Sequence, residues 1–102
     1  MTTEMVARVE LLDTGELLLG LAGEGNPSYQ YVYREAAGVY WSEEPRGFKS
    51  TVIENWSCSK WFSHIVAVVH SGLGVKLVLG KQVAWKNVPD QDIVEIERQN
   101  AF

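Results

Sequence analysis

The spacing of apolar residues near the N-terminus predicts a β-hairpin. Residues 5–12 alternate loosely between apolar and polar, residues 17–21 are rich in leucine, and the turn Asp13-Thr14-Gly15-Glu16 joins them. Two strand-like segments around a short turn that contains glycine are typical of a hairpin. Residues 23–28 are rich in Gly, Asn, Pro and Ser, which predicts a loop after the second strand.

Three tyrosines at a spacing of two predict a third strand. Tyr29, Tyr31 and Tyr33 would then share one face of a sheet, since side chains alternate along a strand. We expect residues 39–41 to form its partner strand after a turn at 36–38. Residues 48–53 and 75–79 predict two further short strands.

Residues from about 56 to 71 predict one long helix. Asn55 or Ser57 can cap its start, and Gly72 and Gly74 can end it. Its apolar residues recur at spacings of three and four, as expected for the buried face of a helix. They are Cys58, Trp61, Phe62, Ile65, Val68 and Val69.

The C-terminal residues 89–98 fit two interpretations. Pro89 followed by Asp90 and Asp92 is typical of a helix start, whereas the alternation over 93–97 also fits a strand. We favour a short helix. With strands first and the long helix after them, the chain predicts an α+β fold. The sheet is expected to be antiparallel, with about five to six strands, and to carry the helix across it in a single domain, 1–102.

The charge of the chain limits its partners. The net charge is −4 at pH 7, and no cluster of Lys and Arg is present, which disfavours nucleic-acid binding. The acids are concentrated in residues 1–35, where they suit a basic protein partner or keep the protein soluble. They are Glu4, Glu10, Asp13, Glu16, Glu24 and Glu35, against Arg8 and Arg34.

The expected compartment follows from the N-terminus and the apolar runs. The N-terminus lacks the features of a signal peptide, and the longest apolar run, 65–69, is too short to span a bilayer. Cys58 is the only cysteine, so no intramolecular disulfide can form. We therefore expect a cytoplasmic protein that does not enter the membrane.

The residues most often used in catalysis do not form a recognisable pair. Cys58 and His64 are six residues apart, which on a helix leaves their side chains about 240° apart. His64 and His70 have the same spacing, so they do not form a metal clamp. We therefore assign no catalytic residue, metal or cofactor, and a non-enzymatic role is favoured.

Aromatic residues with nearby arginines are the best binding candidates, because interface centres use Tyr, Trp and Arg. The candidates are Tyr29, Tyr31, Tyr33, Arg34, Tyr40, Trp41, Arg46 and His64. The leading interpretation is a protein-binding module that self-associates or resembles an inhibitor. The alternative is a small-molecule pocket, or a minor enzyme, between the sheet and the helix. There His64 would act with Arg34 and Glu35 among aromatic side chains that include Trp61.

Three segments resemble small uncharacterised bacterial proteins encoded on mobile integron gene cassettes. They are residues 38–49 (GVYWSEEPRGFK), 61–66 (WFSHIV) and 85–89 (WKNVP). The resemblance implies a compact bacterial accessory domain and assigns no site residue. In size and charge the chain is also similar to small acidic immunity proteins, which neutralise basic toxins.

Overall fold

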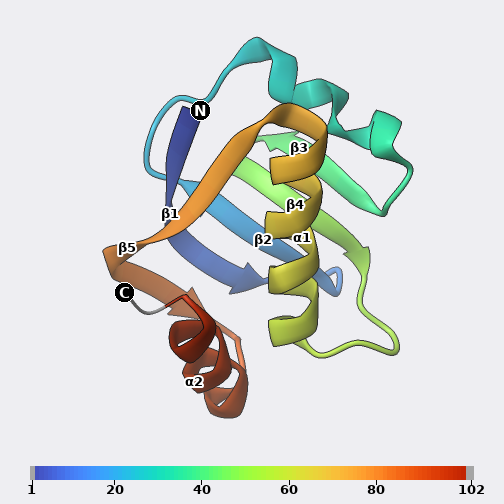
Figure 1. Cartoon of the computed structure of the whole chain (residues 1–102). Helices are drawn as coiled ribbons and strands as arrows, with labels where there is room; N and C mark the ends of the chain where they lie inside the picture. The colour runs from blue at the N-terminus through green and yellow to red at the C-terminus, as the bar shows by residue number, and fades with distance from the viewer. Residues whose placement is uncertain (1, 101–102) are drawn as a thin grey trace.

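The computed structural model describes residues 2–100 and has an α+β fold with a five-stranded sheet and three helices (Figure 1). The predicted class is therefore confirmed. In chain order the elements are β1 (Thr2–Leu11), β2 (Glu16–Leu21), the 3-10 helix η1 (Pro27–Glu35), β3 (Val39–Glu43), β4 (Arg46–Val52), α1 (Cys58–Leu73), β5 (Val75–Lys86) and α2 (Asp90–Gln99).

The sheet is mixed, so the prediction of a purely antiparallel sheet is wrong. Its order is β3-β4-β2-β1-β5, and β5 pairs with β1 in parallel while the other pairs are antiparallel. The reason is the helix between β4 and β5. Neighbouring antiparallel strands can be joined by a tight turn, but a parallel return needs a long crossover. The 16 residues of α1 supply that crossover from β4 to the far edge of the sheet.

The predicted hairpin and both α-helical segments are present. β1 and β2 pair antiparallel around Gly15, whose φ of 91° suits glycine. α1 begins two residues later than expected, with Ser57 as its N-cap and Gly74 as its C-cap in the left-handed conformation. The C-terminal segment is the helix α2, as favoured over a strand.

The tyrosine segment is a 3-10 helix and not a strand. Asn26 caps η1 by accepting a hydrogen bond from the Ser28 amide at 2.9 Å, and Pro27 stands in its first turn. Residues three apart share a face of a 3-10 helix. Tyr29 and Val32 are therefore buried together, whereas Tyr31 and Tyr33 are exposed. Asn26 and Pro27 thus determine the structure of this segment, and the alternation of the tyrosines does not.

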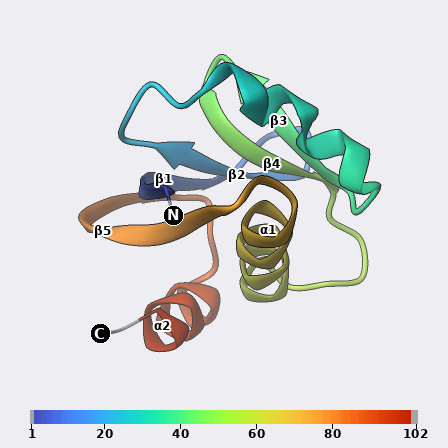
Figure 2. The ribbon, with the colours of Figure 1, turned by 45° about the horizontal axis from the view of Figure 1, so that its top comes forward.

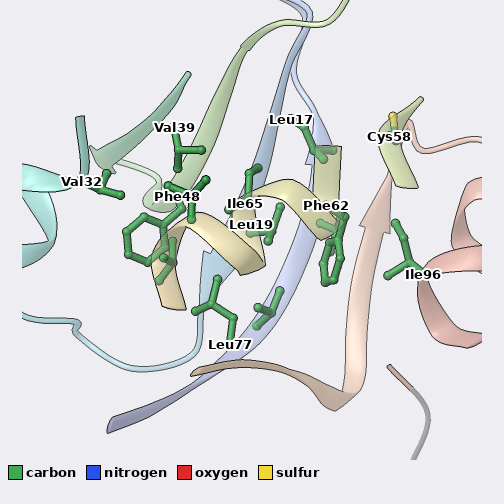
Figure 3. Packing of buried hydrophobic residues seen from close by; sticks show 14 of the residues in the cluster. Leu17, Leu19, Val32, Val39, Phe48, Cys58, Phe62, Ile65, Leu77 and Ile96 are labelled. Atoms are coloured by element: carbon green, nitrogen blue, oxygen red, sulfur yellow. The ribbon is translucent and has the colours of Figure 1, made fainter. Parts of the chain in front are cut away.

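One continuous core joins the helices to the sheet. α1 and α2 lie on the same side of the sheet in Figure 2. Figure 3 shows Phe62 and Ile65 of α1 among side chains from several other elements. These are Leu17 and Leu19 from β2, Val32 from η1, Val39 from β3, Phe48 from β4, Leu77 from β5 and Ile96 from α2. Packed apolar side chains occupy the region between the sheet and α1 that Figure 3 draws.

Asp92 connects the two α-helices through a buried hydrogen bond. Its side chain is 6% exposed, and Oδ1 accepts a hydrogen bond from the Ser59 amide at 3.2 Å. Ser57 accepts from the Lys60 amide at 3.2 Å. The N-terminal amides of a helix lack partners within the helix itself. The sequence predicts only that Asp92 favours the start of its own helix. In the structure it also provides a hydrogen-bond acceptor for an amide in the first turn of α1.

Several acids of the N-terminal third are engaged within the molecule. Tyr29 donates a hydrogen bond to Glu4 at 2.6 Å. Ion pairs join Arg8 to Glu10, Lys86 to Glu10 and Lys49 to Glu16, at 3.4, 3.7 and 3.4 Å. Part of the negative charge expected to attract a basic partner is thus balanced by neighbouring bases.

Candidate functional site

A hollow of about 460 Å³ lies where the loop after β2 meets the β3–β4 hairpin. We call it the Trp41–Arg46 hollow. Its lining combines one indole, one guanidinium, two carboxylates and two side-chain amides. The lining residues are Glu24, Gly25, Asn26, Pro27, Gln30, Trp41, Glu43 and Arg46. Two of the predicted binding residues, Trp41 and Arg46, therefore lie in one concave site.

The hairpin brings Trp41, Glu43 and Arg46 together. Trp41 is paired with Phe48 and Glu43 with Arg46, and side chains two residues apart on a strand share a face. The Trp41 indole donates a hydrogen bond from Nε1 to Glu43 Oε1 at 3.0 Å. This bond fixes both the indole and one carboxylate oxygen at the wall of the hollow.

The opposite wall packs closely on the Trp41 indole. Gly25 has a φ of 79°, and a Cβ atom there would lie 3.0 Å from Trp41 Cη2. Behind the indole, the rings of Tyr29 and Phe48 meet that of Trp41 with centroid distances of 5.5 and 5.0 Å, both near edge-on. The indole is therefore held on several sides, so the wall is formed before a ligand arrives.

Two charged side chains of the hollow form no ion pair within the described residues 2–100. Among residues 2–100, neither Arg46 nor Glu24 forms an ion pair, although Arg46 is the cross-strand neighbour of Glu43. Glu43 uses one oxygen for the Trp41 indole. The hollow thus offers a guanidinium to an anionic group and carboxylates to a cationic one.

Tyr29 supports the hollow from the core and does not line it. Its side chain is 3% exposed, and its hydroxyl donates to Glu4 Oε2 at 2.6 Å. Burial raises the pKa of Tyr29 to about 12, and the hydrogen bond to Glu4 and the Glu4 charge act in the same direction. The residue predicted to bind a partner is thus a structural link between η1 and β1.

The shifted pKa of Tyr29 predicts a loss of stability in alkali. Because the folded pKa of about 12 exceeds the unfolded value of 10.0, the stabilisation is complete below pH 10 and is lost as the pH rises towards 12. The loss should amount to roughly 2–3 kcal/mol. In Tyr29→Phe, urea denaturation at pH 8 to 12 should show a shallower decline. Tyr33→Phe, on the exposed side of η1, should decline like the wild type, and an equally steep decline in Tyr29→Phe would contradict the assignment.

The other predicted binding residues of η1 and β3 lie elsewhere. Tyr31, Tyr33 and Arg34 are exposed on η1, and the Arg34 guanidinium lies 4.3 Å from the centroid of the Tyr31 ring. Tyr40 is exposed on β3, and it alternates with Trp41, so the two side chains point to opposite faces. These four residues do not join Trp41 and Arg46 in the hollow.

His64 lies in an aromatic cluster with Trp56 and Trp61. Its ring is edge-on to both indoles, with centroid distances of 5.1 and 5.3 Å, and its Nε2 is 2.8 Å from the Ala37 carbonyl oxygen. The ring is thus fixed between α1 and the start of β3. Trp56 precedes the helix cap and is not among the predicted binding residues, although it lies only five residues before Trp61.

Residues 2–100 contain neither a group of side chains suited to hold a metal ion nor an activated thiol. No group of three or more His, Cys, Asp and Glu side chains there could hold a metal ion. Cys58 is buried, and burial together with the nearby Asp92 charge raises its pKa, which lowers its reactivity. Within residues 2–100, no helix is long and apolar enough to cross a membrane.

Comparisons with known proteins identify the family. A family model described as Integron Cassette Protein Hfx_Cass5 matches residues 23–83. A solved Hfx_Cass5 structure from the mobile metagenome of the North West Arm Sewage Outfall is 37% identical, with 100% of this chain and 99% of that chain covered and a TM-score of 0.44. A search of curated proteins finds no match. The resemblance inferred from sequence is thereby confirmed, and the chain belongs to the Hfx_Cass5 family of integron cassette proteins.

Proposed function

We propose that this cassette protein binds a small zwitterionic molecule, of the size and charge of an amino acid, in the Trp41–Arg46 hollow. The observation that carries the proposal is the guanidinium of Arg46, which forms no ion pair among residues 2–100, in one hollow with the carboxylates of Glu24 and Glu43. A ligand with both charges would satisfy both kinds of group. A volume of about 460 Å³ lies within the usual range for small-molecule sites, about 300–1,000 Å³.

Each wall of the hollow has a chemical role in the proposed complex. Arg46 would bind the ligand carboxylate, because a guanidinium matches that group with two parallel hydrogen bonds. Glu24 and the free oxygen of Glu43 would bind the ammonium group. The Trp41 indole would contact the apolar part of the ligand, and the amides of Asn26 and Gln30 would take its remaining polar atoms.

We propose that the hollow binds its ligand without converting it chemically. Neither histidine of the chain lines the hollow. The hollow therefore lacks the side chain that most often serves as a general acid or base near neutral pH. The enzyme interpretation requires His64 to act with Arg34 and Glu35. His64 contacts the Ala37 carbonyl and two indoles, and Arg34 and Glu35 are exposed, so the hollow around Trp41 has the stronger support as a ligand site.

The test is a titration with the twenty standard amino acids, observed through the indole N–H signals of a nitrogen-15 labelled sample. Each of the four tryptophans gives its own signal. A binder should move the Trp41 signal and leave that of Trp85 unchanged. The N-acetyl and the carboxamide derivatives of the binder should each bind at least about tenfold more weakly, because each lacks one charge.

Substitution of Arg46 tests whether the ligand binds in the hollow or elsewhere on the surface. Arg46→Gln should weaken binding by about tenfold or more, because it removes a charged hydrogen-bond donor. Arg34→Gln makes the same change on the exposed side of η1 and should leave binding unaltered. Full binding by Arg46→Gln, or the absence of any Trp41 shift across the panel, would refute the proposal.

A protein partner is the second candidate, on a smaller surface than expected. The idea of a tyrosine face rested on a strand, whereas Tyr29 is buried and only Tyr31, Tyr33 and Arg34 remain exposed together on η1. Exposed tyrosines beside an arginine are what supports it, since interface centres are enriched in these residues. Sedimentation that stays monomeric at all concentrations would argue against self-association.

A further inference from the structure

A second hollow, of about 220 Å³, lies at the start of α1 and shares no residue with the Trp41–Arg46 hollow. We call it the tryptophan hollow. It lies between the end of β4, the connection to α1 and the first turn of that helix. Its lining residues are Thr51, Val52, Glu54, Asn55, Trp56 and Trp61.

Two indoles form fixed walls of the tryptophan hollow. The rings of Trp56 and Trp61 have centroids 5.0 Å apart and planes inclined at 53°. His64 braces both rings edge-on and is itself held at the Ala37 carbonyl. Gly38, with a φ of 76°, leaves room for Trp61, since a Cβ atom there would lie 3.1 Å from Trp61 Cη2. Two inclined aromatic walls are therefore present without a ligand.

One acidic and one basic side chain stand beside this hollow. The Lys60 ammonium group lies 4.6 Å from the centroid of the Trp56 ring, so that ring attracts a positive charge, and a cationic ligand would displace this exposed, flexible side chain from it. Glu54 lines the hollow and, within residues 2–100, forms no ion pair. No basic side chain is among the lining residues. Indole faces together with an unpaired carboxylate match a positively charged group with an apolar surface.

We propose that the tryptophan hollow binds a quaternary ammonium group of the choline type. Methyl groups around the nitrogen make such a cation large and weakly hydrated, so it can leave water for an aromatic wall more easily than a primary ammonium can. Trp56 and Trp61 contact the methyl groups, and Glu54 balances the charge. The small volume suits the head group, with the rest of the ligand extending into solvent.

The experiment compares choline with 3,3-dimethyl-1-butanol, its uncharged analogue of the same shape. Choline should move the indole signals of Trp56 and Trp61, and the neutral alcohol should bind at least about tenfold more weakly. Equal binding of both compounds would mean that the hollow selects apolar shape and not charge, which overturns the proposal. So would unmoved Trp56 and Trp61 signals at molar choline.

Two variants and a matched control locate the site. Trp56→Leu should weaken choline binding by about tenfold, and Glu54→Gln by roughly threefold, since each removes one attraction for the cation. Glu44→Gln makes the same change at an exposed residue of the β3–β4 turn and should bind like the wild type. An unchanged amide spectrum away from α1 will show that each variant is folded. Undiminished binding by Trp56→Leu or Glu54→Gln would contradict the assignment.

The two binding proposals can be refuted independently of each other. Zwitterion binding is observed through Trp41 and weakened by Arg46→Gln, whereas choline binding is observed through Trp56 and Trp61 and weakened by Glu54→Gln. The same labelled sample serves both titrations.

Discussion

Gly47→Ala should destabilise the protein by about 3 kcal/mol, because the added methyl group has no space beside the neighbouring strand. A Cβ atom at Gly47 would overlap the Leu19 carbonyl oxygen and would lie 2.8 Å from Gly20 Cα. Both atoms belong to the backbone of β2, so no side chain can rotate away. The strands β2 and β4 would have to separate in the middle of the sheet, where Gly20 is paired with Gly47.

Gly47→Ala should also displace the lining of the Trp41–Arg46 hollow, because Arg46 directly precedes Gly47 in β4. Urea denaturation measures the loss of stability, and titration with a zwitterionic binder should show weakened affinity in the same variant. Gly23→Ala is the control, since its Cβ would be 3.4 Å from Glu4 Oε1, an ordinary contact distance. It should alter stability by about 0.5 kcal/mol or less. A Gly47→Ala protein as stable as the wild type would show that β2 and β4 do not approach this closely.

Asp92→Ala should cost about 2–3 kcal/mol, because it leaves the Ser59 amide buried without a hydrogen-bond partner. The loss should loosen α2 from α1 before the whole domain unfolds. Cys58 is next to Ser59 and is the only thiol, so its labelling by a thiol reagent reports this opening. We expect labelling to become faster in Asp92→Ala under native conditions.

Asp90→Ala distinguishes the two roles of an acid at the start of α2. Asp90 lies in the same first turn as Asp92 but is exposed. Its replacement should cost only the attraction to the dipole of α2, about 0.5 kcal/mol. Equal losses in Asp90→Ala and Asp92→Ala, with no change in Cys58 labelling, would mean that Asp92 acts on its own helix alone.

The local elements were largely predictable because their signals are local. The turn around Gly15, the cap at Ser57 and the stripe from Cys58 to Val69 each lie within one element, and each has the predicted structure. The tyrosine segment differs from its prediction although the signal for a helix is also local. Asn26 and Pro27 start a helix there, whereas the period of two in the tyrosines predicts a strand.

The candidate sites were predictable only where their residues are near in sequence. Trp41 and Arg46 are both predicted binding residues, and a single hairpin brings them together. Glu24 and Gln30 reach the same hollow only because η1 packs against β3. The sequence pattern does not predict Trp56 and Glu54 as site residues, because both precede the helix cap and their neighbours become apparent only in the folded chain.

The α+β class, the hairpin, the two α-helices and the family can be predicted from the residues alone, because these depend on periodicity, caps and the identity of nearby residues. Three features become apparent only in the folded chain: the parallel pairing of β1 with β5, the burial of Tyr29 against Glu4, and the contact of Asp92 with the start of α1. The physical reason is the same in each case. These hydrogen bonds join residues 25 or more positions apart, and their partners are chosen by the packing of one shared core.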